Sequence, residues 1–184
     1  MAILYILLII LAVILFVSFL IYNGLIAARN KVKNAWSQID VQLKKRYDLV
    51  PNLVETVKGY LKHEQGTLTK ITELRTQAMQ TKDRKETMKA NEQMSKAIGG
   101  LLNVVVENYP DLKASQNFLM LQEELSGIEN KIAYSRQYYN DTVMDYNNKT
   151  EMFPTNLFAK MFNFQKQEFL EATTEERKNI KVSF

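Results

Sequence analysis

The side chains that most often carry out chemistry are scarce in this sequence of 184 residues, which has one histidine and no cysteine. His63 is followed by Glu64, but a zinc-protease helix needs a second histidine four positions later, where Thr67 stands. The glycine pair in "AIGGLLNV" lacks the lysine and the preceding strand of a phosphate-binding loop. Carboxylate pairs such as Glu123-Glu124 are typical of solvated helix faces. We therefore expect no enzyme, no metal site and no cofactor.

A mostly polar line of residues between positions 116 and 150 is the strongest remaining candidate for a functional surface. Its members recur every three or four positions, which places them on one helix face: Gln122, Ser126, Glu129, Ala133, Arg136, Asn140, Val143 and Asn147. An earlier helical segment offers polar partners: Arg46, Asp48, Asn52 and Glu55. Partly buried amides and charges must be paired, so we predict a structural polar network. Its predicted members are Arg46, Asp48, Asn52, Glu129, Arg136, Asn140 and Asn147. The alternative is that the line simply faces water.

The first 28 residues contain no charged side chain, and the run exceeds the ~20 residues that cross a bilayer. Its length and the lack of a basic amino-terminal region favour an uncleaved membrane anchor over a signal peptide. Tyr5 and Tyr22 are about 26 Å apart along a helix, so each ring can lie at a membrane interface. Gly24 and Ala28 form a small-residue pair suited to contact between spans, and Arg29 is the first charge.

Basic residues follow the anchor, and they predict its orientation. They are Arg29, Lys31, Lys33, Lys44, Lys45 and Arg46, with Asp40 the only acid among them. The positive-inside rule places this side in the cytoplasm and the N-terminus outside. Along most of the chain acidic and basic residues interleave, and the net charge of the whole sequence is only +4, so we expect no nucleic-acid partner. The expected partners are the lipid bilayer, further copies of the chain and other membrane proteins.

The rest of the chain reads as long helices, because it has only 6 glycines and 3 prolines. Apolar residues recur at steps of three and four from Trp36 to Leu61, and this phase survives Pro51, where we expect a kink. A turn then follows at 63–66, which we favour, or at 80–85. From Phe118 to Tyr146 the spacing is that of a coiled-coil seam, and it predicts a helix from 116 to 150.

These segments predict an all-α fold: a single N-terminal transmembrane helix, a long antiparallel three-helix bundle and a short C-terminal helix after Pro154. The predicted boundaries are 1–28 for the anchor, 29–165 for the bundle and 166–184 for the tail. Four aromatic residues near the end can cover the bundle, contact lipid or meet another copy, and core packing is favoured for Phe162. They are Phe158, Phe162, Phe164 and Phe169.

Four stretches of this sequence resemble the LemA family of bacterial membrane proteins. They are "RYDLVPNLVETVKGYLKHE", "ENYPDLKASQNFLMLQEELSGIENKIAYSRQYYNDTVMDYN", "FPTNLFAKMFNF" and the ending "KVSF". The resemblance covers nearly the whole chain and implies a short N-terminal span followed by a long helical bundle. It also implies a bacterial inner-membrane protein with an external N-terminus, and it carries over no catalytic residues. One departure is Gly99-Gly100, where a close approach of a neighbouring helix is the simplest structural reason.

Two functions remain after these exclusions. The first is a membrane-anchored scaffold or interaction protein that assembles with copies of itself and has no catalytic activity. The apolar stripes beyond one seam and the small-residue pair favour it. The second is a regulatory or accessory subunit of a membrane enzyme or signalling system, with its site in the polar stripe of Glu129, Arg136 and Asn140.

Overall fold

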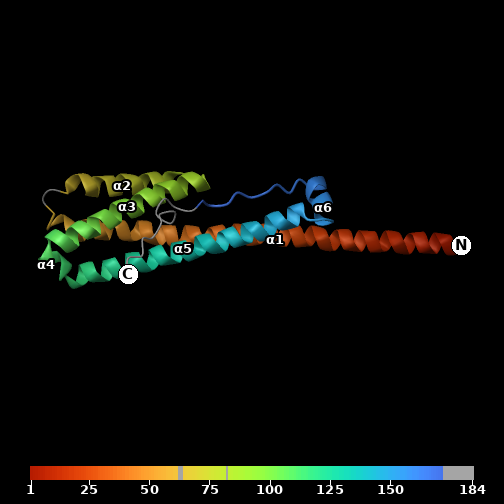
Figure 1. Ribbon diagram of the computed structural model, residues 1–184, viewed down its shortest axis with the longest axis horizontal. Helices are drawn as coiled ribbons and strands as arrows, with labels where there is room; N and C mark the ends of the chain where they lie inside the picture. Colours follow the sequence, from red (N-terminus) through yellow and green to blue (C-terminus); the bar gives the residue numbers. More distant parts are fainter. Residues whose placement is uncertain (62–63, 82, 172–184) are drawn as a thin grey trace, which may run out of the picture. The chain divides into compact units, whose positions relative to one another are not determined.

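A computed structural model of the chain describes residues 1–61, 64–81 and 83–171. Every regular element within them is a helix, which confirms the all-α class (Figure 1). The helices are α1 (Ala2–Lys58), α2 (Gln65–Gln80), α3 (Arg84–Asn108), α4 (Pro110–Lys113), α5 (Gln116–Glu151) and α6 (Thr155–Met161). The chain forms two compact units. Unit 1 comprises Met1–Gln38 and Ser135–Phe169, and of the described residues unit 2 comprises Ile39–Tyr134 with Leu170 and Glu171.

The first helix, α1, is unbroken over 57 residues. It runs through the predicted anchor boundary at residue 28, and it continues through Pro51 as the sequence predicts. Of the described part of the chain, α1 alone is long and apolar enough to cross a membrane. Its large apolar side chains are exposed up to Leu20, and Leu25 is the first one buried inside the chain. The exposed apolar part of α1 therefore ends near Tyr22.

In unit 1, α1 packs antiparallel against the second half of α5. The Lys31 ammonium lies 3.3 Å from the Asp145 carboxylate, and the rings of Trp36 and Tyr139 meet edge to face with centroids 5.9 Å apart. From the first pair to the second, the residue number rises along α1 and falls along α5, so the two helices run in opposite directions. The buried residues of α1 here follow steps of three and four, as an amphipathic helix requires: Leu25, Ala28, Val32 and Ala35.

The chain reverses after α6 through a left-handed residue, Asn163, with φ at 53°. The Phe164 N–H donates to the Ala159 carbonyl at 2.8 Å, and the Asn163 N–H donates to the Lys160 carbonyl at 3.3 Å. This pair of bonds is the Schellman ending of a helix, in which asparagine is one of the few residues that accept the left-handed conformation. The turn directs the buried Phe164 back toward α1.

In unit 2, α2 and α3 lie side by side as an antiparallel hairpin (Figure 1). Both candidate turns exist, because α1 ends at Lys58, α2 begins at Gln65 and α3 begins at Arg84. The predicted second helix of the bundle is therefore two helices. The Asp83 side chain caps α3 by accepting the Glu86 N–H at 2.9 Å, which is why a new helix starts there. His63 lies outside the described residues.

Gly99 and Gly100 lie inside α3, and a Cβ at either position would meet no neighbouring atom within 4 Å. A close helix approach is therefore not the reason for this pair. Since glycine costs a helix interior roughly 1 kcal/mol relative to alanine, Gly100→Ala should raise the free energy of unfolding by about 0.8 kcal/mol. Urea denaturation followed by circular dichroism measures this gain. Asn103→Ala, also exposed on α3, is the matched control and should gain less. A lower stability of Gly100→Ala would contradict the prediction.

Candidate functional site

Arg46 is a charged side chain inside unit 2, with 3% of its surface exposed. It is buried because it follows Leu43 by three positions and precedes Val50 by four, so it shares their helix face. Its Nη1 lies 3.1 Å from Oε2 of Glu129 on α5. Burial lowers the pKa of the Arg46 guanidinium, and the Glu129 carboxylate opposes this by favouring the charged form.

Hydrogen bonds extend this ion pair across α3. The Ser95 hydroxyl donates to Oε1 of Glu129 at 2.6 Å, so each carboxylate oxygen has a partner. One turn earlier on α3, the Asn91 amide donates to the Tyr47 hydroxyl at 2.6 Å and to the Thr87 carbonyl at 2.8 Å. Tyr47 is the residue after Arg46, so the bonds return to α1.

A residue of α2 completes the set. Nε of Arg75 donates to the Tyr47 main-chain carbonyl at 2.7 Å. We call these residues the polar cluster: Arg46, Tyr47, Arg75, Asn91, Ser95 and Glu129. It joins α1, α2, α3 and α5, and it fixes their register because a shifted helix would leave buried polar groups unpaired. Arg46 and Glu129 belong to the network predicted from sequence, whereas its α2 and α3 members were not foreseen.

The Tyr47 hydroxyl gives unit 2 a dependence on alkaline pH. Burial raises the pKa of Tyr47, while the Asn91 hydrogen bond and the Arg46 charge partly oppose the rise. A raised folded pKa stabilises the fold below the ordinary tyrosine pKa of about 10, and this stability is lost as pH rises through the folded value. We expect the stability to fall above about pH 10 and Tyr47→Phe to remove part of that fall.

Urea midpoints measured between neutral and strongly alkaline pH test this prediction. At neutral pH, Tyr47→Phe should itself lose about 1 kcal/mol, because the buried Asn91 amide loses its acceptor. Part of the alkaline fall should persist, since burial also raises the pKa of Tyr146. Tyr134→Phe, which removes an exposed phenol, is the control. An alkaline fall of the same size in Tyr47→Phe and the parent chain would contradict the assignment.

In unit 1, buried tyrosines of α5 hold the main chain that follows α6. The Tyr146 hydroxyl donates to the Gln165 carbonyl at 2.9 Å, and the Tyr139 hydroxyl donates to the Glu168 carbonyl at 3.2 Å. We call residues 165–168 the tail strap. Their backbone is neither helix nor strand, so its polar groups need partners outside regular structure. The tyrosines supply them through hydroxyl groups at the tips of buried rings.

Asn147 binds the strap most closely. Its amide nitrogen donates to the Gln167 carbonyl at 2.9 Å, and its amide oxygen accepts the Gln167 N–H at 2.9 Å. A side-chain amide matches a main-chain amide in this way because each offers one donor and one acceptor. Near the same end of α5, Lys166 forms an ion pair with Glu151. Asn147 therefore binds the tail strap and not the first helix.

Two predicted members of the polar network lie elsewhere. Asp48 is exposed and pairs with Lys44 of its own helix at 3.3 Å, and Asn52 is also exposed. Asp48 is two positions from Arg46, which places it on nearly the opposite side of α1, and Asn52 follows one turn later on that outer side. Their assignment to the buried network is therefore corrected. Arg136 and Asn140 are partly buried on α5.

The predicted interface residues of the anchor divide into two groups. Tyr5 is exposed, whereas the Tyr22 ring packs edge to face on Phe162 and Phe164, at centroid distances of 4.8 and 6.0 Å. The Arg29 guanidinium lies 5.2 Å from the centroid of the Phe164 ring. Tyr22 and Arg29 thus receive the segment after α6, a contact that sequence periodicity does not reveal because the partners are far apart in the chain.

The small-residue pair has a different environment from the one predicted. Ala28 is buried by its own chain, with 7% of its surface exposed. A Cβ on Gly24 would meet no neighbouring atom within 4 Å. Of the predicted pair, Ala28 is therefore covered by its own chain, and only Gly24 is open to a second span.

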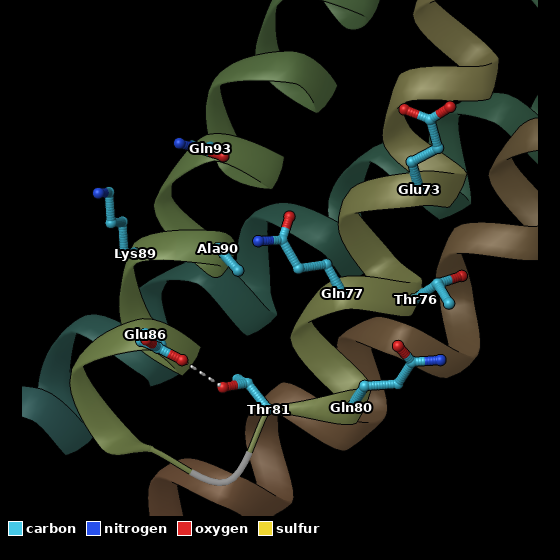
Figure 2. Close-up of a pocket in the computed structure, with 9 residues that line it drawn as sticks. All are labelled: Glu73, Thr76, Gln77, Gln80, Thr81, Glu86, Lys89, Ala90 and Gln93. Carbon is cyan, nitrogen blue, oxygen red and sulfur yellow. Dashed lines mark hydrogen bonds between the residues drawn. The ribbon is translucent and has the colours of Figure 1, made fainter.

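A shallow cleft of about 730 Å³, lined mostly by residues with polar side chains, lies between α2 and α3 (Figure 2). Only the Thr81 hydroxyl and the Glu86 carboxylate are joined across it, at 3.0 Å, while Lys89 and Gln93 point away from α2. Such divergent side chains do not form a set of groups that could act on one bound molecule. In the part of the chain that the structure describes, no three histidine, cysteine, aspartate or glutamate side chains are grouped as metal ligands.

Comparison with known proteins shows what this chain is similar to. The family model described as the LemA family matches residues 35–184, which include the polar cluster and the tail strap. Protein LemA of Metamycoplasma hominis is 30% identical over 162 residues, covering 88% of this chain and 74% of that protein. Magnetosome proteins MamQ 1 and MamQ 2 of Paramagnetospirillum magneticum are each 22% identical over 189 residues, covering 88% of this chain and 70% of theirs.

Proposed function

Since this chain belongs to the LemA family, we propose that it is a membrane-anchored helical-bundle scaffold that acts by contact with other proteins, including copies of itself, and catalyses no reaction. Family membership and the apolar α1 fit a membrane-anchored protein. The relatives named as magnetosome proteins also fit association with membranes. The finer assignments are a single-pass anchor, a cytoplasmic bundle and self-assembly.

One observation carries the scaffold proposal: the polar side chains that sequence analysis favours as a site are engaged inside the chain. Both Glu129 oxygens are occupied, by Arg46 and by Ser95, and the Asn147 amide is occupied by Gln167. Such groups stabilise one arrangement of the helices and leave little capacity to bind a further molecule. The outer helix faces are then the parts that partners contact. The same observation disfavours the alternative of an accessory subunit that acts through Glu129.

An apolar surface in unit 2 is the best candidate for contact between copies. Leu119 and Met120 are exposed at neighbouring positions near the start of α5. Met120 also lines a shallow groove of about 240 Å³ with Leu121 and with Thr56 of α1. Exposed apolar side chains beside a groove are typical of protein-contact sites.

Photo-cross-linking in intact membranes tests the scaffold proposal. A photoreactive phenylalanine in place of Met120 should join two copies of the chain, whereas the same residue at the exposed Asn130 should do so much less. Recovery of one different protein in constant proportion would instead favour the accessory-subunit alternative. A chain that forms no cross-link and has a monomeric mass in mild detergent would contradict self-assembly.

Orientation can be tested separately, because the chain has no cysteine of its own. Lys45 is exposed on α1, after the apolar segment. With the bundle in the cytoplasm, Lys45→Cys should react with a membrane-impermeant maleimide only after the cells are lysed. Labelling of intact cells would show that this side of the span faces outward, and it would overturn the orientation but not the anchoring.

A further inference from the structure

The surface of α6 and of the turn before it is apolar although it faces outward. Five large apolar side chains are exposed there, and we call them the α6 knuckle: Met152, Phe153, Leu157, Met161 and Phe162. Phe153 alone is 80% exposed. A group of exposed apolar side chains, unlike a single scattered one, indicates a surface that contacts another molecule or a membrane. The inner side of α6 is already packed, because Ala159 is buried. The knuckle is therefore an additional apolar face and not an unfilled part of the core.

The position of the α6 knuckle, next to the apolar part of α1, indicates what covers it. The ring of Phe162, a knuckle residue, lies 4.8 Å from the ring of Tyr22. Tyr22 is where the exposed apolar part of α1 ends, since Leu25 is the first apolar residue buried inside the chain. Tyrosines favour the boundary between headgroups and acyl chains. A bilayer that surrounds α1 up to Tyr22 would bring its headgroup region directly to α6.

The charges around the knuckle suit the same environment. Exposed lysines flank it at Lys149, Lys160 and Lys166, while the nearby Glu151 is paired with Lys166. Apolar side chains bordered by lysines are the pattern of segments that lie in the surface of an anionic membrane. The apolar surface of the span and that of the knuckle adjoin through the contact between Tyr22 and Phe162, so one lipid phase can cover both.

We propose that the α6 knuckle is a second lipid contact, inserted at the headgroup boundary of the leaflet in which Tyr22 ends the span. The inference rests on the membrane anchoring in the proposed function. It adds that the bundle is held to the membrane at two points. In unit 1 the helix pair of α1 and α5 would then have a defined rotation relative to the bilayer, because α6 lies on one side of α1.

Fluorescence quenching in vesicles tests this directly. The full chain has one tryptophan, so Trp36→Phe provides a silent parent into which single reporters are placed. Phe153→Trp reports the knuckle, Phe16→Trp reports the span, and Tyr138→Trp is an exposed control on α5. Tyr138 is next to Tyr139, whose ring contacts Trp36 of α1. Trp36 lies about 21 Å from Tyr22 along α1, so the control reporter is far from the expected membrane boundary.

Each variant is reconstituted in vesicles of phosphatidylcholine and phosphatidylglycerol, with or without bromine on the acyl chains near the carbonyl end. Segments in the interface lie about 5–10 Å deep, so the knuckle and span reporters should each lose about half of their emission to the brominated lipid. The Tyr138→Trp control should lose little. Leu157→Trp provides a second knuckle reporter, and circular dichroism checks that each variant keeps the helicity of the parent.

The outcomes separate this inference from the anchoring that it requires. Quenching of Phe16→Trp without quenching of either knuckle reporter would overturn the lipid contact and leave the anchor in place. No quenching of Phe16→Trp would overturn the anchor and the lipid contact together. Knuckle emission that is insensitive to bromine but shifts to the blue with protein concentration would assign the surface to a second copy, and would also overturn the lipid contact.

Discussion

Replacing Glu129 with alanine should lower the free energy of unfolding by about 3 kcal/mol, whereas replacing its partner Arg46 with methionine should cost about 1 kcal/mol. The asymmetry follows from burial. The Arg46 side chain is 4% exposed and the Glu129 side chain is 46% exposed. Without Glu129, the guanidinium remains inside the bundle with its charge uncompensated. Without Arg46, water can solvate the carboxylate, and methionine fills much of the vacated volume.

Chemical denaturation of the two single variants and of the double variant measures the difference and the coupling between the residues. Glu123→Ala, an exposed carboxylate on the same helix, is the matched control and should lie within about 0.5 kcal/mol of the parent. The double variant should recover much of the loss caused by Glu129→Ala, because the stranded charge is then absent. Equal losses in the two single variants would show that burial does not control the energetics of this pair.

Replacing Asn147 with alanine should release the tail strap while the helices remain folded. The change removes both bonds to the Gln167 main chain and leaves its N–H and carbonyl on a partly buried surface. A loss of about 1.5–3 kcal/mol of local stability corresponds to roughly 10- to 100-fold faster exchange of the Gln167 amide hydrogen. Hydrogen exchange read by mass spectrometry resolves the peptide that contains residues 165–168.

Asn148→Ala is the control for this experiment, because Asn148 is the exposed neighbour on the same helix. In Asn148→Ala, the amide hydrogens of the tail strap should exchange at the rate of the parent chain. Exchange in the first half of α5 should stay unchanged in Asn147→Ala, since the tail strap lies on the second half. Unaltered protection of Gln167 in Asn147→Ala would mean that the tyrosine contacts alone hold the strap.

Local periodicity was sufficient to predict α5, because the seam from Phe118 to Tyr146 advances at alternating steps of three and four and is apolar except at Ser135 and Thr142. It was not sufficient to count the turns. Gly66 and the charged run near Asp83 were both credible breaks, and only the structure shows that α2 and α3 are separate helices. The cap formed by Asp83 is a local signal that could have indicated the second turn from sequence alone.

Helix periodicity also explains why only part of the polar cluster could be predicted. Arg46 and Glu129 meet because each lies three or four positions from buried residues of its own helix. Grouping Asp48 with Arg46 failed, since a step of two changes the helix face. The tail strap was missed because an extended segment has no helical period. The hydroxyl of Tyr146 and the amide of Asn147, both on the buried side of α5, were nevertheless polar groups that required partners.

Most of the bonds by which α5 holds residues 165–168 are made to main-chain carbonyls and one main-chain amide, and the ion pair of Lys166 with Glu151 adds to them. The Gln165 side chain is exposed, so a dye, an affinity tag or an unrelated residue attached there should leave the segment in place. Proline at position 167, by contrast, should weaken the hold, because proline has no N–H to donate to the Asn147 amide oxygen. Because this segment is bound mainly through its main chain, it is a convenient attachment site for engineering this protein.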